Sequence, residues 1–68
     1  MKIMFNVGEY VLNQNTGNIG KVIGYGHQIL KEGYTTTLKV LVDQALTSGR
    51  RGIVEEDVYS SWTSWVKS

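Results

Sequence analysis

The clearest hydrophobic pattern in the chain is that of YTTTLKVLVD, residues 34–43, in which most of the apolar side chains fall on even-numbered positions. Successive side chains of a strand point to opposite faces, and β-branched residues are common in strands. We therefore predict a strand over this stretch. The face that we expect to meet the core carries Tyr34, Thr36, Leu38, Val40 and Val42.

Shorter apolar stretches, separated by turn residues, predict four further strands. Because the chain contains no proline, glycine, asparagine, serine and aspartate must mark the turns. The expected strands cover residues 10–12, 21–25, 52–54 and 59–62, with connections at 13–20, 27–33 and 44–51. The segment EEDV, residues 55–58, is expected to form one 3₁₀ turn, and Gly33 is well placed for a positive φ angle.

Five short strands with glycine-rich turns predict an all-β fold in which the sheet closes into a small barrel. Closure removes the exposed edges that an open sheet of this size would present. Gly20, Gly24 and Gly26 would allow the bends and bulges that closure requires. We expect a single domain over residues 1–68, with its core at about 5–62 and a short C-terminal tail.

Composition limits the kinds of protein that this chain can be. With 68 residues, 41% of them hydrophobic, the chain is long enough for one small core. On folding, a chain of this size buries about 60% of the surface that it exposes when unfolded. It has no cysteine and one histidine, which excludes a disulfide and a zinc site built on cysteine or several histidines. No apolar run approaches the roughly 20 residues of a membrane span, and the first residues show no secretory signal. We expect a cytoplasmic protein.

Three parts of the chain, the third made of two segments, resemble small Src-homology-3-like barrels. FNVGEYVLN, residues 5–13, resembles the opening of many such barrels, and NTGNIGKVIGY, residues 15–25, is similar to the glycine-turn-strand core of the KOW motif. TTTLKVLV and GIVEEDV resemble the third and fourth strands with a closing 3₁₀ turn. The resemblance covers residues 5–62 and implies a five-stranded barrel with a short 3₁₀ turn before the last strand. Such barrels include KOW domains of ribosomal and transcription factors and small accessory subunits of photosynthetic complexes. Because a fold does not fix a function, no functional residue is carried over.

The glycine-rich stretch NTGNIGKVIGYG, residues 15–26, raises the question of a phosphate-binding loop. A P-loop would need glycine and a hydroxyl residue where Asn15 and Val22 stand. A dinucleotide fingerprint would need glycine where Ile29 stands, in a segment that opens a helix. We therefore interpret the stretch as a turn followed by a strand that glycine allows to bend, and we predict no cofactor.

Three consecutive acidic residues, Glu55, Glu56 and Asp57, are a candidate cation site. The spacing of an EF-hand is absent, and we interpret the run as a solvated turn that discourages edge pairing. His27 is interpreted as a histidine in a polar connection, because nothing in the chain resembles a nucleophile elbow. No residue constellation indicates catalysis, so we predict that the protein is not an enzyme and holds no metal.

Aromatic and arginine residues are the candidates for a binding surface. Tyrosine and tryptophan are enriched at interface hot spots, and the arginine guanidinium matches carboxylates and phosphates. The chain has more large aromatic residues than so small a core can hide. The predicted partner-binding residues are Tyr10, Tyr25, Tyr34, Arg50, Arg51, Trp62 and Trp65.

The two tryptophans leave two interpretations open. In an extended segment, residues three apart face opposite sides, so that one is buried and the other exposed, whereas in a helical turn they share a face. Either Trp62 plugs the open end of the barrel with Trp65 in a loose tail, or the two belong to a patch that binds a partner.

These observations predict a non-catalytic protein-interaction module, a small accessory subunit or regulator that docks on a larger complex. The alternative is a KOW-like module that binds RNA or DNA in transcription or translation, which the second predicted strand favours. A net charge of +1 is low for a dedicated nucleic-acid-binding domain, so such a contact would be weak. We expect a monomer or a homodimer, because a small core gains from further burial.

Overall fold

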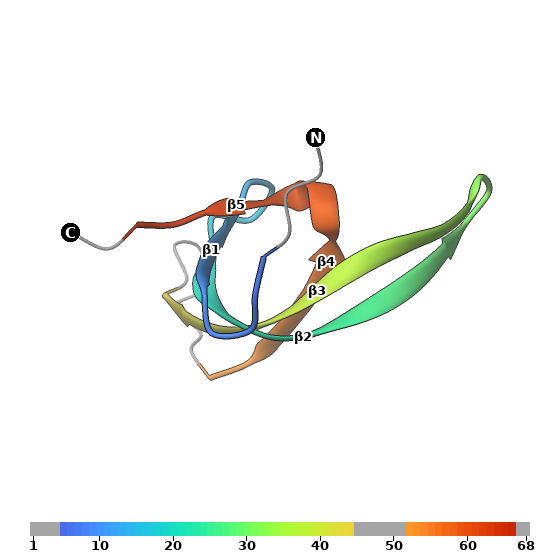
Figure 1. The fold of residues 1–68 in the computed structure, drawn as a ribbon. Helices are drawn as coiled ribbons and strands as arrows, with labels where there is room; N and C mark the ends of the chain where they lie inside the picture. The colour runs from blue at the N-terminus through green and yellow to red at the C-terminus, as the bar shows by residue number, and fades with distance from the viewer. Residues whose placement is uncertain (1–4, 45–51, 67–68) are drawn as a thin grey trace.

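The computed structural model describes residues 5–44 and 52–66. They form five antiparallel strands in one sheet, in the order β4-β3-β2-β1-β5, and one 3₁₀ helix (Figure 1). The elements are β1 (Tyr10–Asn13), β2 (Ile19–Leu30), β3 (Gly33–Gln44), β4 (Val54–Val58), η1 (Tyr59–Ser61) and β5 (Trp62–Ser64). The prediction of an all-β fold with five strands and one 3₁₀ turn is confirmed.

The second predicted strand is too short, because β2 continues five residues beyond Tyr25. The expected connection at 27–33 is instead the end of a long hairpin, in which only Lys31 and Glu32 form the turn. Gly33 has the expected positive φ, at +120°. The strand was missed because HQIL shows no alternation of its own and is extended only through its pairing with the threonine-rich start of β3.

The prediction for residues 52–62 is displaced along the chain. The acidic residues form most of β4 rather than a 3₁₀ turn, and the 3₁₀ helix η1 follows at Tyr59–Ser61, where the last strand was expected. Three consecutive acidic residues show no alternation of apolar and polar side chains, so the sequence does not reveal the strand. The two faces of β4 are both polar here and differ only in the residues to which their carboxylates are hydrogen-bonded. The predicted loop 44–51 begins one residue too early, since Gln44 still belongs to β3, and the remainder of the loop lies outside the described residues.

The core lies on the inner face of the bent sheet. Its buried side chains are Phe5, Val11, Val22, Leu38, Val40 and Trp62, and Tyr59 packs against them. The predicted core face of β3 is correct for Leu38, Val40 and Val42, which are fully buried. It is wrong for Tyr34 and Thr36, which are exposed because β3 has left the body of the protein there.

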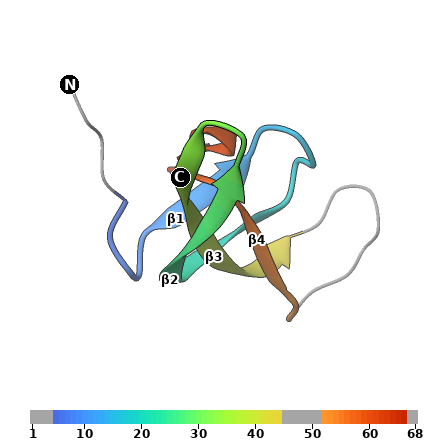
Figure 2. The same cartoon turned by 90° about the vertical axis from the view of Figure 1, so that its right-hand side faces the viewer.

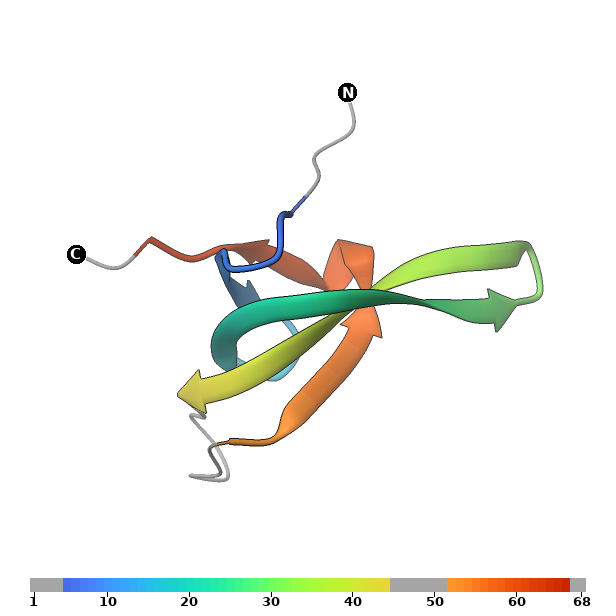
Figure 3. The same cartoon turned by 60° about the horizontal axis from the view of Figure 1, so that its bottom comes forward.

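Two irregularities in the pairing of β2 with β3 bend the sheet. The register shifts between Ile19 and Gly20 and again between Val22 and Gly24. At the second shift Ile23 has no partner on β3, as expected for a bulge. The prediction that glycines accompany bulges in this strand is thus confirmed for Gly20 and Gly24. Figures 2 and 3 show the resulting sheet, which is strongly twisted rather than flat.

The sheet is open among the described residues, since β4 and β5 pair only with β3 and β1, so the predicted closed barrel is not confirmed. Hydrogen bonds outside the ladders nevertheless link the two ends of the sheet. The Trp62 indole N–H donates to the carbonyl oxygen of Asp57 at 3.2 Å, and the Gln14 N–H donates to the carbonyl of Ser61 at 2.8 Å. Helix η1 therefore holds the end of β4 beside the start of β5.

Candidate interaction surface

The most prominent feature of the molecule is the end of the β2–β3 hairpin, which projects from the body (Figures 1 and 3). We call residues 26–36 the arm. Strand β1 pairs with β2 only as far as Lys21, and β4 pairs with β3 only from Thr37 onward. The arm is therefore two-stranded, with no further strand beside it among the described residues.

One face of the arm carries apolar and aromatic side chains, and we call it the arm face. Cross-strand pairing places His27 opposite Thr36 and Ile29 opposite Tyr34, on the same side of the hairpin as Leu38 of the core. The side chains of Ile29 and Tyr34 are 74% and 77% exposed. The rings of His27 and Tyr34 meet edge to face, with their centroids 6.3 Å apart. The two residues line a shallow depression. The arm face thus continues the core face into solvent.

Tyr25 lies where the arm joins the body. It is paired with Leu38, and its hydroxyl donates a hydrogen bond to the carbonyl oxygen of Phe5. This bond ties the chain before β1 to the base of the arm. Part of the Tyr25 ring stays exposed, so the residue extends the arm face toward the core.

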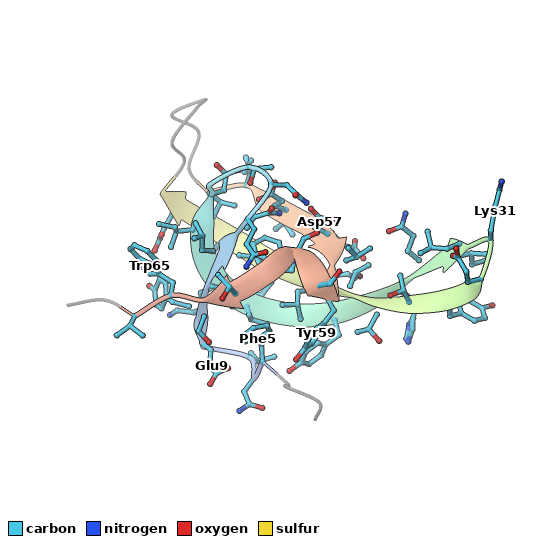
Figure 4. The ribbon with its side chains drawn as sticks, turned by 90° about the horizontal axis from the view of Figure 1, so that it is seen from above. Phe5, Glu9, Lys31, Asp57, Tyr59 and Trp65 are labelled. Carbon is cyan, nitrogen blue, oxygen red and sulfur yellow. The ribbon has the colours of Figure 1, made fainter. Side chains whose placement is uncertain are left out.

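Tyr10 and Trp65 lie on the outer face of the sheet. The Trp65 N–H donates to the Tyr10 carbonyl oxygen at 3.0 Å, which continues the β1–β5 pairing by one residue. Both residues line a shallow depression with Glu9, and the ammonium of Lys21 lies 5.7 Å from the centre of the Tyr10 ring. In Figure 4, Trp65 and Lys31 of the arm tip lie at opposite ends of the molecule.

The predicted partner-binding residues therefore do not form one surface. Tyr25 and Tyr34 belong to the arm side, whereas Tyr10 and Trp65 belong to the outer face. Trp62 is only 4% exposed and belongs to the core cluster, so it does not lie at the surface where the prediction placed it. Arg50 and Arg51 lie outside the described residues.

Sequence reasoning missed Ile29 and the position of His27 beside Tyr34. Both residues were assigned to a connection, in which neither the facing of a side chain nor a cross-strand neighbour can be predicted. A sequence signal for this hairpin does exist. Residues 31–32 can form a two-residue turn between the segments IL and GY, and that turn brings Ile29 opposite Tyr34.

A buried asparagine organises the polar seam between the β1–β2 turn and β4. The Asn13 side-chain oxygen accepts hydrogen bonds from the N–H groups of Asn15 and Thr16, at 2.8 and 3.2 Å. Its amide nitrogen donates to a carboxylate oxygen of Asp57 at 3.0 Å. This donation by Asn13 is the main cause that lowers the pKa of Asp57; burial opposes it, and the N–H of Val58 adds to it.

The other two carboxylates of β4 are also engaged, on opposite faces of the strand. Glu55 accepts from the Asn18 side-chain amide at 3.3 Å, while the Thr37 hydroxyl donates to Glu56 at 2.5 Å. The interpretation of the acidic run as a solvated turn is therefore wrong, because these carboxylates hold β4 against its neighbours. No group of three or more His, Cys, Asp or Glu side chains suited to a metal occurs within residues 5–44 and 52–66.

No protein-family model, curated protein or solved structure matches the chain. In the part of the chain that the structure describes, no helix is both long and apolar enough to cross a membrane. The arm face and the outer face around Tyr10 are thus the two surfaces on which a functional proposal can be built.

Proposed function

We propose that the protein is a non-catalytic interaction module with an SH3-like barrel fold, and that its partner is a protein that contacts the arm face. The observation that carries the proposal is the exposure of Ile29 and Tyr34 on a projecting hairpin. The fold assignment is supported by the 3₁₀ helix directly before the last strand, which the resemblance to such barrels predicts.

The composition of the arm face favours a protein partner. Tyr25, His27, Ile29, Tyr34 and Thr36 include no lysine, arginine, aspartate or glutamate. Burying an exposed isoleucine side chain is worth about 1.5–3 kcal/mol, and tyrosine is a frequent hot-spot residue. The charged residues Lys31 and Glu32 lie at the tip, where they would form part of a polar rim.

The test is affinity capture from the native host with the full chain as bait, at low salt. The informative variant is Tyr34→Lys, which places a charge on the arm face without emptying the core. We expect the partner proteins retained by the natural chain to be lost, with at least a tenfold drop in recovery, because a charge at a hot spot must be desolvated on binding.

The matched control is Val54→Lys, which makes the same gain of charge at a 55% exposed strand residue outside the arm. Recovery should be unchanged in this control. Nuclease treatment distinguishes a protein-binding module from the alternative, a module that binds RNA or DNA. Partners that are held through RNA or DNA disappear with nuclease in every sample. Capture that is equal for the natural chain and for Tyr34→Lys would contradict the arm as the contact site.

A further inference from the structure

The arm leaves a strand edge unpaired. From Gly24 to Leu30, β2 pairs with β3 on one side and has no ladder partner on the other among the described residues. The last backbone bonds on that side are made by Val22, whose carbonyl accepts from Gly8 and whose N–H donates to Glu9. Alternate N–H and C=O groups of the arm therefore point outward from the sheet edge.

This edge lacks the features that keep strand edges apart. Natural edge strands carry lysine, proline or inward charges, which make pairing with another chain unfavourable. Residues 23–30 read IGYGHQIL, without proline and without a lysine, arginine, aspartate or glutamate. The one bulge in this part of β2 lies at Ile23, so the edge from Tyr25 to Leu30 is regular.

The arm also gains little stability by itself. An isolated two-stranded hairpin is marginal in water, and three or more strands with a covered face are needed for independent stability. The arm turns Ile29 and Tyr34 toward solvent, and every residue of its β2 half from His27 to Leu30 is exposed. A third strand against the β2 edge would stabilise the hairpin by completing its hydrogen bonds.

We propose that this strand is the same segment of a second copy, so that the two β2 edges pair antiparallel about a two-fold axis beside Gln28. The inference rests on the proposed role of the arm as the contact site. In this pairing Ile29 lies opposite His27 of the other copy, and Tyr25 lies opposite Lys31 of the other copy.

No charge repulsion opposes the pairing of two such segments, because residues 23–30 contain no lysine, arginine, aspartate or glutamate. With the axis beside Gln28, no two like charges face each other from Gly24 to Glu32. Two copies of one patch form a closed isologous contact, the commonest arrangement of soluble homodimers. The joined arms make a four-stranded sheet whose apolar face is twice that of one arm. The doubled surface is the one offered to the partner protein.

The experiment measures the mass of the purified chain by analytical ultracentrifugation over a series of concentrations. We expect a reversible equilibrium between one and two chains. Ile29→Lys should raise the dimer dissociation constant at least tenfold, because each dimer gains two charges beside the axis. Val54→Lys is the matched control and should leave the constant unchanged, since it adds the same charge away from the arm.

A second measurement locates the contact. In a mixed sample of isotope-labelled and unlabelled chains, filtered nuclear Overhauser effects should connect Ile29 of one copy to His27 of the other.

A chain that stays monomeric at millimolar concentration, or a dimer that Ile29→Lys leaves intact, would overturn the inference. A monomer that still captures its partner through Tyr34 would leave the proposed function standing, so that the two failures are distinguishable. If the edge instead binds a partner's strand, the purified chain is monomeric and the self-pairing is rejected.

Discussion

At the residue scale, the hydrogen bond from Asn13 to Asp57 couples the stability of the fold to pH. Because the pKa of Asp57 is lowered in the folded protein, its contribution to stability is complete above the unfolded value near 4. The contribution is lost as the pH falls through the lower folded value. Hydrogen bonds to charged groups are worth about 1 kcal/mol more than bonds between neutral groups.

We therefore expect Asp57→Asn to lose about 1 kcal/mol of unfolding free energy at pH 7 and to approach the natural chain in acid. Urea unfolding, followed by tryptophan fluorescence between pH 7 and the acid range, measures the difference. Glu32→Gln, at the exposed turn of the arm, is the control and should change little. A difference between Asp57→Asn and the natural chain that stays constant down to strong acid would contradict the role of this carboxylate.

At the scale of the strand, two glycines of β2 make a matched pair. A Cβ atom at Gly20 would overlap the backbone carbonyl of Leu41 on β3, whereas a Cβ atom at Gly24 would meet nothing within 4 Å. Because the carbonyl belongs to the sheet ladder, it cannot move aside without breaking the pairing. Gly20→Ala should thus cost more than about 2 kcal/mol, and Gly24→Ala should stay within about 0.5 kcal/mol.

Thermal and urea unfolding of the two alanine variants test this difference directly. Both substitutions change the flexibility of the unfolded chain in the same way, so the contrast reports the folded state. Equal stability of the two variants would mean that β2 and β3 approach less closely at Gly20 than the structure places them.

The elements differ in how far the sequence predicts them, for physical reasons. Strand β3 was predictable because Leu38, Val40 and Val42 are apolar residues at every second position and also face the core. Strand β4 was not, because Glu55 and Asp57 face inward as acids whose partners lie far along the chain, at the end of β1 and in the β1–β2 turn. A pattern of polarity carries no information on a hydrogen bond that joins residues 44 positions apart, such as Asn13 and Asp57.

The candidate site was predictable in part for the same reason. Tyr34 was singled out by its residue type, but its exposure contradicts the core face that alternation assigned to it. Alternation identifies which residues share a face, and it does not show where along a hairpin the body of the protein ends. Ile29 became visible as a surface residue only when β2 was found to extend to Leu30.

At the scale of the whole molecule, the small core limits how much change the fold tolerates. At 0.05–0.15 kcal/mol per residue, a chain of 68 residues has a total stability of roughly 3–10 kcal/mol. Leu38 has no exposed surface and lies in the core cluster, whereas Leu41 on the same strand is 41% exposed on the outer face. The two leucines therefore separate core packing from strand propensity.

Leu38→Ala should lose about 2–5 kcal/mol, because it removes buried methyl groups and leaves a cavity that the sheet cannot fill. That loss is a large fraction of the total, so circular dichroism at 37 °C should show a substantial unfolded population. Leu41→Ala makes the same chemical change and should lose less than about 1 kcal/mol of unfolding free energy. The methyl groups that it removes lie on a partly exposed surface, so no buried cavity is left behind. If both variants lost the same free energy, the stability of the protein would depend on the outer face as much as on the core, which would contradict the assignment of Leu38 to the core face and Leu41 to the outer face of β3.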